Sequence, residues 1–190
     1  MRIGLARHFR VQEPWPAGRV TLAELLAWRR RYDQAAVCPV PVEDQSARWS
    51  RCYASDLPRA VATAEAMYAG GIILHAGLRE AEFAALPGLH GRFPVWVWRI
   101  LIRVAWTAGH SSQRSLRDDF VRRVSAVADV IEAQAESALV VSHAGTMIYL
   151  RKELARRGFH GPKFGVAEHA RVYEFERPDR SAVLAGVSTG

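Results

Sequence analysis

The chain lacks the features that mark membrane, secreted and disulfide-rich proteins. No apolar run reaches the roughly 18 residues of a membrane span. Arg7 and His8 fall inside what would have to be the apolar region of a signal peptide. The two cysteines, Cys38 and Cys52, have no metal-ligand spacing, so we expect reduced thiols. We expect a cytoplasmic protein whose 190 residues form a single domain, residues 1–190.

Lysine is also nearly absent. Of 26 basic residues only Lys152 and Lys163 are lysines, and the net charge is +7. Basic surfaces attract phosphate groups, but these arginines are scattered and no nucleic-acid-binding motif accompanies them. We therefore expect neither a nucleic acid nor a membrane as partner, while the positive charge favours anionic substrates.

Strand-like apolar runs recur along the chain, with helical patterns between most of them. The runs cover residues 2–6, 50–54, 72–75, 138–142, 171–176 and 183–187. Thr21 and Glu24 form a capping box that starts one helix, and apolar residues at helical spacing from Leu116 to Ile131 mark a longer one. This order predicts an α/β fold, a three-layer α/β/α sandwich with a mostly parallel, mixed central sheet.

Two histidines stand directly after strand-like runs. Arg7 and His8 follow the first run, and His143 follows the run at residues 138–142. Ligands bind at the carboxyl ends of strands in open α/β sheets, so both imidazoles are expected at one rim. Arg59, shortly after another run, is expected there too. Imidazole beside guanidinium is typical of phosphate chemistry.

Four segments resemble, in order, the motifs of the histidine phosphatase (phosphoglycerate mutase-like) superfamily. The family opens with a strand and Arg-His-Gly, and its fourth motif is a strand that ends in Ser-His-Gly-Gly. The second motif is roughly Ser-Ser-Asp-Leu-x-Arg-Ala, and the third begins Leu-x-Glu. The corresponding segments here are Arg7-His8-Phe9, Ala54–Ala64, Leu78–Ala84 and Val140–Gly145.

The resemblance implies how the predicted site works. His8 would attack the phosphoryl group and form a phosphohistidine that water then hydrolyses. Arg7, Arg59 and, if it is protonated, His143 would bind the phosphoryl oxygens as charge develops on them. His143 would thus serve both catalysis and phosphate binding. No cofactor and no metal ion are expected.

A carboxyl group must protonate the leaving alkoxide. The resemblance assigns this role to Glu80 in the third segment. Glu82, two residues on, would point to the same side of an extended segment, so it stays an alternative. The segment also lacks a family glycine, since it continues as Phe83-Ala84.

The first segment departs from the family after its histidine. Phe9 replaces the glycine, and Val11 stands where many relatives have threonine. Arg10, next to Val11, could supply the substrate contact that Val11 lacks. On an extended segment, however, the Arg10 side chain would point away from the side that Val11 faces. These departures leave the catalytic residues in place and affect the choice of substrate.

The predicted function is hydrolysis of a phosphomonoester, either a phosphorylated small molecule or a phosphoprotein. A mutase of the same family is an alternative, although mutases are usually longer. A weakly active protein that binds phosphorylated ligands is another. A metal enzyme is disfavoured, because the His-Glu-x-x-His spacing is absent and converging arginines would repel a divalent cation.

Two loops and one helix are expected near the substrate. The loops are residues 11–19, with Pro14, Trp15 and Pro16, and residues 87–91. The helix covers residues 93–106, with Pro94 in its first turn. Its predicted core face is Val97, Ile100, Leu101 and Val104, and its predicted exposed face is Trp96, Arg99, Arg103 and Trp106. The exposed face would cover the pocket or form a homodimer surface.

Overall fold

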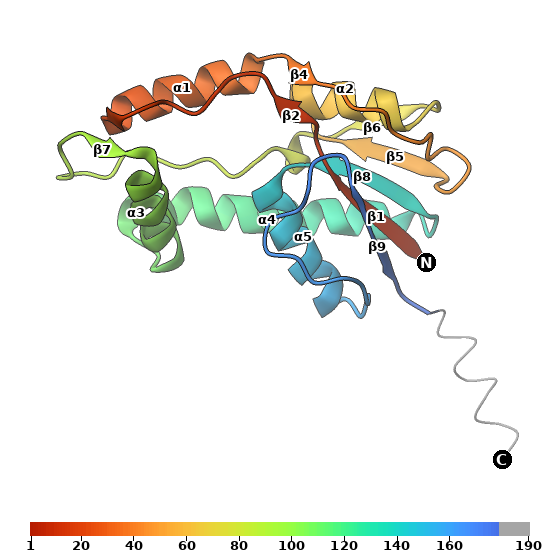
Figure 1. Cartoon of the computed structure of the whole chain (residues 1–190). Helices are drawn as coiled ribbons and strands as arrows, with labels where there is room; N and C mark the ends of the chain where they lie inside the picture. Colours follow the sequence, from red (N-terminus) through yellow and green to blue (C-terminus); the bar gives the residue numbers. More distant parts are fainter. Residues whose placement is uncertain (179–190) are drawn as a thin grey trace, which may run out of the picture.

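A computed structural model describes residues 1–178, in which a five-stranded sheet forms the centre (Figure 1). Its strands are β1 (Arg2–Arg7), β5 (Arg51–Ala54), β6 (Ile72–Leu74), β8 (Ala138–Ser142) and β9 (Val172–Glu176). They lie in the order β6-β5-β8-β1-β9; the first four are parallel, and β9 is antiparallel to β1. All five were predicted. The sixth predicted strand, residues 183–187, lies outside the described residues.

The amino-acid pattern of each strand fits its place in the sheet. β8 lies in the middle, and all five of its residues are buried, as expected of a parallel strand covered on both faces. β9 lies at the edge, and its buried Tyr173 and Phe175 alternate with less buried residues. Burial of β8 on both faces explains why its sequence is a continuous apolar run rather than an alternating one.

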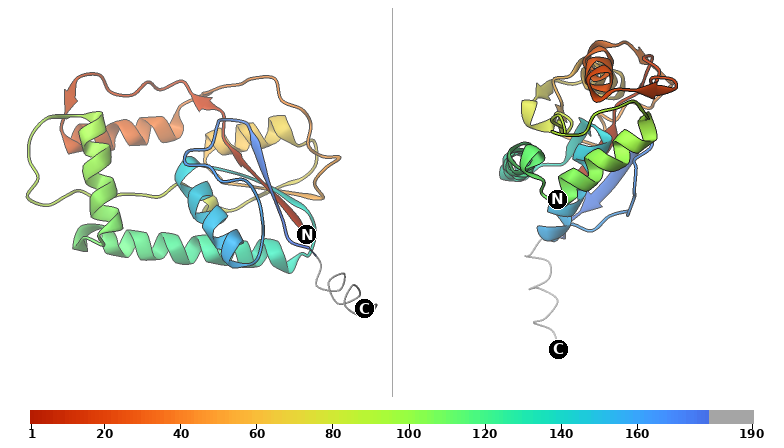
Figure 2. Two further views of the ribbon diagram at one scale, coloured as in Figure 1. Left: turned by 60° about the horizontal axis from the view of Figure 1, so that its bottom comes forward. Right: turned by 90° about the vertical axis from the view of Figure 1, so that its left-hand side faces the viewer.

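Helices cover both faces of the sheet, which confirms the predicted three-layer α/β/α architecture (Figures 1 and 2). α2 (Pro58–Met67) packs on one face in a cluster with Trp49. α4 (Ser111–Ala133) and α5 (Ala144–Arg156) pack on the other face. None of the helices in this described part is both long and apolar enough to cross a membrane.

Two further helices extend the molecule beyond the carboxyl end of β1 (Figure 1). They are α1 (Leu22–Gln34) and α3 (Val95–Thr107), and their apolar side chains form a cluster separate from the two sheet cores. Short strand pairs fix the connecting segments: β2 (Arg10–Val11) with β4 (Val37–Cys38), and β3 (Arg19–Val20) with β7 (Phe93–Pro94). A short 3-10 helix, η1 (Ala76–Leu78), follows β6. The two-residue strands were not predicted, because so short a segment shows no periodicity.

The structure corrects the predicted faces of α3. The helix begins at Val95, with Pro94 just before it, and Ile100 and Val104 are more than half exposed. Its buried residues are instead Trp98 and Trp106. The Trp98 indole donates a hydrogen bond to the Val20 carbonyl (2.7 Å), and that of Trp106 donates to the Tyr149 hydroxyl (3.0 Å). Indoles bury more apolar area than aliphatic side chains, and here each also finds a polar partner, so they take the core positions.

Candidate active site

The structure brings the two strand-end histidines together. β1 and β8 pair in a parallel register that places Arg7 opposite Ser142, so His8 and His143 leave the sheet at the same level. The His8 amide also donates to the Ser142 carbonyl (3.0 Å). The two rings lie 5.0 Å apart between centroids, and both side chains are buried. Parallel pairing alone therefore builds the centre of the predicted site.

The hydrogen bonds of His8 leave one ring nitrogen free. Its Nδ1 lies 2.6 Å from the Phe9 carbonyl oxygen, which can only accept, so Nδ1 carries the proton. Nε2 then keeps its lone pair. Burial lowers the pKa of His8 to about 2, and the positive charge of Arg59 acts in the same direction. His8 is thus a neutral imidazole with Nε2 available as a nucleophile.

Arg59 reaches the histidines from the first turn of α2 and is almost completely buried. Its Nε donates to Nδ1 of His143 (3.2 Å), and its Nη1 donates to Oδ1 of Asp33 on α1 (2.9 Å). A buried guanidinium needs such a carboxylate, because removing its charge from water is costly. Asp33 was not predicted from the sequence, since an aspartate near the end of a helix carries no signal of a buried partner.

His143 is neutral in this arrangement. Its Nδ1 accepts from Arg59, so the proton lies on Nε2, which is 2.9 Å from Oγ of Ser55. Burial lowers the pKa of His143 well below its usual value, and Arg59 and His8 lower it further. In the free protein His143 is therefore not protonated, and it does not carry the positive charge that its expected role in phosphate binding requires. A bound phosphate would favour the protonated form by opposing the charge of Arg59.

Arg7 and His169 flank His8. Nη1 of Arg7 donates to the Ala167 carbonyl (2.9 Å), while its buried Nε has no hydrogen-bond partner among the described residues. His169 lies 2.6 Å through Nδ1 from the His8 carbonyl oxygen, and its ring centroid is 5.4 Å from that of His8. Burial lowers the pKa of both side chains. His169 was not predicted, because it follows no strand-like run.

Glu80 lies at the start of α5, the helix that begins directly after His143. Its carboxylate accepts hydrogen bonds from the backbone amides of Gly145 and Thr146 (both 3.0 Å). A Cβ at Gly145 would lie 2.5 Å from Oε1 of Glu80, so the absent side chain makes room for the carboxylate. Glu82 is exposed instead. The structure thus separates the two candidates and brings Glu80 to the side of the site.

Uncharged residues of the four motif segments form hydrogen bonds between these segments. Oγ1 of Thr63 accepts from the Phe9 amide (2.8 Å) and donates to the Arg59 carbonyl (2.7 Å). Oγ of Ser142 donates to the Leu78 carbonyl (2.8 Å). Phe9 is buried, and its backbone lies outside the left-handed region, so glycine's conformational freedom is not needed there. The departure at Phe9 is therefore compatible with the site.

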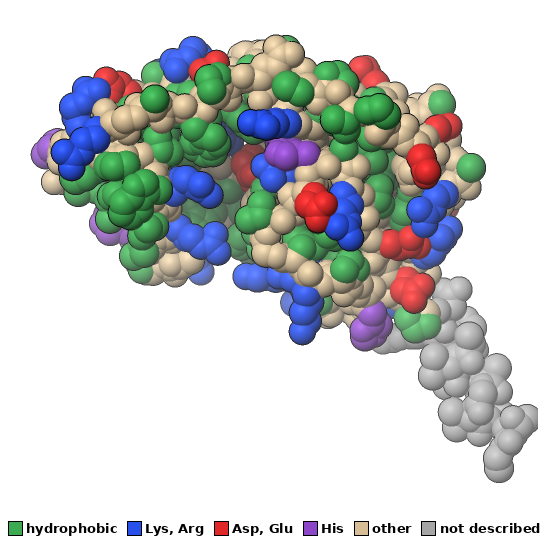
Figure 3. Space-filling model, in the orientation of Figure 1, with side chains coloured by type: hydrophobic (Ala, Val, Ile, Leu, Met, Phe, Trp, Pro, Cys, Tyr) green, Lys and Arg blue, Asp and Glu red, His purple; other side chains and the backbone are tan. Residues whose placement is uncertain are grey.

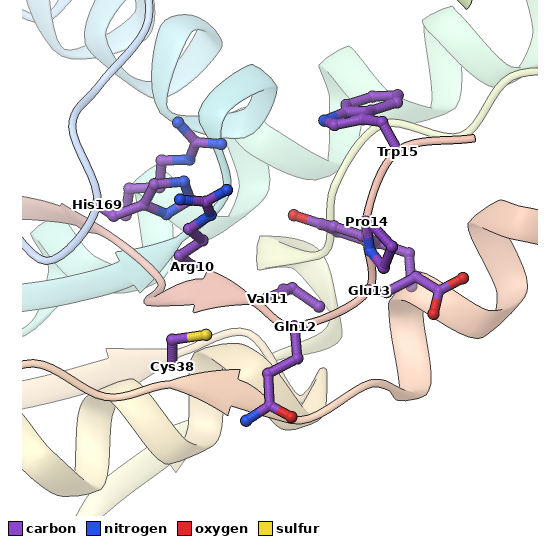
Figure 4. Close-up of a pocket in the computed structure, with 10 residues that line it drawn as sticks. Arg10, Val11, Gln12, Glu13, Pro14, Trp15, Cys38 and His169 are labelled. Atoms are coloured by element: carbon purple, nitrogen blue, oxygen red, sulfur yellow. The ribbon is translucent and has the colours of Figure 1, made fainter. Parts of the chain in front are cut away.

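A pocket of about 350 Å³ opens beside Arg7 and His169 (Figure 4). Its lining residues are Arg7, Arg10, Val11, Gln12, Glu13, Pro14, Trp15, Tyr32, Cys38 and His169. The loop expected at residues 11–19 thus lines the pocket in part, whereas residues 87–91 are not in its lining. Arg10 and Val11 both line it, although alternation predicted opposite directions. Basic side chains gather around the hollow on this face of the molecule (Figure 3).

The site combines neutral imidazoles with guanidinium groups, a set suited to binding and attacking a phosphoryl group. Within residues 1–178 no group of three or more His, Cys, Asp or Glu side chains is placed to hold a metal ion. Cys38, at the pocket, is exposed, and Cys52 is buried; both are free thiols, as expected. Burial raises the pKa of Cys52 to about 12.

Comparison with known proteins bears on the family and the fold. The family model "Histidine phosphatase superfamily (branch 1)" matches residues 40–188, which include Arg59, Glu80 and His143 but not His8. Among solved structures, the chain is similar to a "putative alpha-ribazole-5'-P phosphatase" from Escherichia coli, with a TM-score of 0.53 and 17% identity over 92% of this chain and 89% of that one. At this identity the likeness concerns the fold. No curated protein matches the sequence.

Proposed function

The chain belongs to the histidine phosphatase superfamily, and from this membership we propose that it hydrolyses phosphomonoesters through a phosphohistidine at His8. The observation that carries the proposal is the hydrogen-bonded state of His8. Its Nδ1 is bound to the Phe9 carbonyl, its Nε2 is free, and burial keeps the ring neutral. A neutral imidazole held in one tautomer is the form that can attack phosphorus.

In the first step, Nε2 of His8 bonds to phosphorus as the bond to the leaving oxygen breaks. Arg7 and Arg59 bind the phosphoryl oxygens, where charge is spread during transfer. His143 joins them once the bound phosphate has raised its pKa and Nδ1 has taken up a proton, for which the Nε–H of Arg59 must turn from that nitrogen to a phosphate oxygen. The leaving alkoxide takes a proton from Glu80, which enters the cycle as the protonated carboxyl group.

In the second step, water attacks the phosphohistidine. The Glu80 carboxylate accepts the proton of that water, the bond between Nε2 and phosphorus breaks, and inorganic phosphate leaves. His8 and Glu80 return to their starting states, so no cofactor is consumed. In each of the two displacements, one group attacks phosphorus and Glu80 gives or accepts the proton.

A screen of phosphomonoesters with release of inorganic phosphate as readout tests this proposal. We expect hydrolysis by the unaltered protein and loss of nearly all of it in His8→Ala. His143→Ala should also lose most activity, and the double variant should lose little more, because members of a catalytic unit act together. Transfer of phosphate within a substrate without net release would point to a mutase. Binding without turnover would point to a phospho-ligand-binding protein.

A further inference from the structure

The pocket beside His8 has two chemically different walls. In Figure 4, Arg10 and His169 lie on one side of it and Trp15 lies across from them. Arg7 is also part of the lining. The cationic wall adjoins the nucleophile, because His169 contacts the His8 carbonyl. The Trp15 indole itself contacts Trp28 and Arg99, which the phosphoryl transfer does not use, so it is available to the rest of the substrate.

The cationic wall keeps its charge unneutralised. The guanidinium of Arg10 is exposed and makes no hydrogen bond or ion pair with any residue from 1 to 178. Glu13 is the carboxylate in the lining, but it is paired with Arg31 (3.0 Å). This wall therefore suits the anionic end of a substrate, which lies next to His8.

Trp15 is held in place while more than half of its surface stays exposed. Its indole stacks on Trp28, with 4.3 Å between centroids and 27° between planes. The Trp28 indole donates to the Pro14 carbonyl (2.7 Å) and so fixes the turn that carries Trp15. The guanidinium of Arg99, on α3, lies 5.4 Å from the Trp15 ring. An aromatic group positioned in advance costs little to order on binding.

The support for Trp15 continues to the catalytic centre. The Trp28 ring lies 5.1 Å from that of Tyr32, and the guanidinium of Arg59 lies 5.1 Å from the Tyr32 ring. The exposed indole is thus the outer member of a packed row that ends at a phosphate-binding arginine. An exposed tryptophan in a concave site, fixed by partners that serve that site, is characteristic of ligand pockets.

We propose that the site takes small phosphomonoesters whose leaving group carries a planar aromatic ring, with the ring stacked on Trp15 and the phosphate at His8. The inference rests on the proposed function, since it assigns the phosphate end to His8. A pocket of about 350 Å³ lies at the lower end of the range for small ligands, which favours an ester of mononucleotide size over a phosphoprotein.

Matched substrates separate the aromatic ring from the phosphate. Adenosine, guanosine, cytidine and uridine 5′-monophosphates share their sugar phosphate with ribose 5-phosphate, which lacks the base. Base stacking on an aromatic side chain corresponds to roughly tenfold or more in affinity. We expect kcat/KM for the best nucleotide to exceed that for ribose 5-phosphate by about this factor. In Trp15→Ala the ratio should approach one.

Two variants control for effects on the fold. Trp15→Phe keeps an aromatic face and should retain most of the preference. Trp96→Ala removes an exposed tryptophan of α3 that does not line the pocket, and it should leave the ratio unchanged. A Trp15→Ala protein that loses both substrate classes equally, or neither, would overturn the inference.

Binding measurements test the preference for an aromatic ring independently of the proposed hydrolysis. Calorimetric titration of His8→Ala with each nucleotide and with ribose 5-phosphate reports affinity without turnover. If no ester is hydrolysed, the proposed function fails, yet the nucleotide preference and its loss in a His8→Ala, Trp15→Ala double variant still test the pocket. Equal affinity for nucleotides and ribose 5-phosphate would contradict the aromatic wall, whatever the activity.

Discussion

His8 and His143 have similar sequence contexts, but their hydrogen bonds give them different chemistry. His143 uses both ring nitrogens, one with Arg59 and one with Ser55. His8 uses only Nδ1 in this way and keeps Nε2 free. A nucleophile needs a free lone pair, so the geometry favours His8 over His143 for attack.

Replacement of Glu80 by glutamine tests its role as proton donor. Alkyl phosphates have a poor leaving group that needs a proton, whereas nitrophenyl phosphate does not. We expect Glu80→Gln to reduce kcat for an alkyl phosphate at least about tenfold more than for nitrophenyl phosphate, given that general acids contribute about 100-fold or more. Steady-state kinetics on the two substrates measure the difference.

Glu82→Gln is the matched control, because Glu82 is two residues away and exposed. It should leave both rates near those of the unaltered protein. Equal losses on both substrates in Glu80→Gln would mean that Glu80 only caps α5, and a leaving-group effect in Glu82→Gln would transfer the role to Glu82.

Some residues of the site could be predicted from a local pattern, and others owe their place to contacts with distant parts of the chain. His8 and His143 follow strands, and the end of a strand can be read from a local apolar run. Asp33 and His169 contribute through contacts with Arg59 and with the His8 carbonyl, which lie far along the chain. Such partners depend on how helices and loops pack, which local pattern does not encode.

At the level of elements, the start of α5 joins two parts of the site. His143 precedes the helix, and Glu80 accepts hydrogen bonds from its first amides. The positive end of the helix dipole also favours an acidic side chain there. The position of Glu80 therefore depends on a close approach to the helix backbone, which Gly145 permits.

Gly145→Ala should displace Glu80 and leave the fold intact. The added Cβ would lie 2.5 Å from Oε1 of Glu80, closer than real contacts allow, so the carboxylate must move. We expect a loss of kcat of at least about tenfold on alkyl phosphates, similar in pattern to Glu80→Gln. Kinetics together with the melting temperature measure activity and fold separately.

Gly165→Ala serves as the comparison, since a Cβ there meets no atom within 4 Å and its φ is not positive. It should leave activity and melting temperature nearly unchanged. Full activity in Gly145→Ala on alkyl phosphates would contradict the requirement for a precisely placed Glu80.

Helices differ in how far the sequence predicts them. The capping box of α1 forms as predicted, because Thr21 and Glu24 bond within one turn. For α3, the exposure of Trp96, Arg99 and Arg103 was predicted correctly. The predicted core face and the exposure of Trp106 were wrong, because apolar residues occupy nearly every side of the helix and local spacing does not select one face. Contacts with β3 and α5 determine which residues of α3 are buried, since these elements supply the hydrogen-bond partners of the Trp98 and Trp106 indoles.

At the level of the whole molecule, the buried histidines link stability to pH. In the unfolded chain a histidine titrates near its usual pKa of about 6.5. Burial lowers the pKa of His8 to about 2 in the folded protein and that of His143 well below its usual value. Below about pH 6.5 the unfolded chain therefore binds protons that the folded chain does not, and stability falls as the pH falls.

Urea unfolding at pH 7.5, 6.5 and 5.5 measures this dependence. Each of the two histidines should lower the free energy of unfolding by up to about 1.4 kcal/mol per pH unit below pH 6.5. His8→Asn should remove one such contribution, whereas His90→Asn, at an exposed position, should keep the full slope. An unchanged slope in His8→Asn would show that His8 is protonated in the folded protein.

The architecture was predictable because the long strands carry strong local signals, whereas the details of the pocket were not. β1 and β8 are continuous apolar runs, and their parallel pairing follows from the α/β order. The pocket depends on β2 and β4, whose two-residue strands carry no periodic signal. Its opposed walls arise only when α1 and α3 pack around the loop that carries Trp15.

The most direct test of the account is to trap the phosphorylated protein during turnover. Rapid quenching with a labelled phosphomonoester, followed by proteolysis and mass analysis, should find phosphate on the peptide that contains His8. The adduct should be lost in acid, and it should be absent from His8→Ala. Steady hydrolysis without any acid-labile adduct on His8, together with full activity of His8→Ala, would contradict the account.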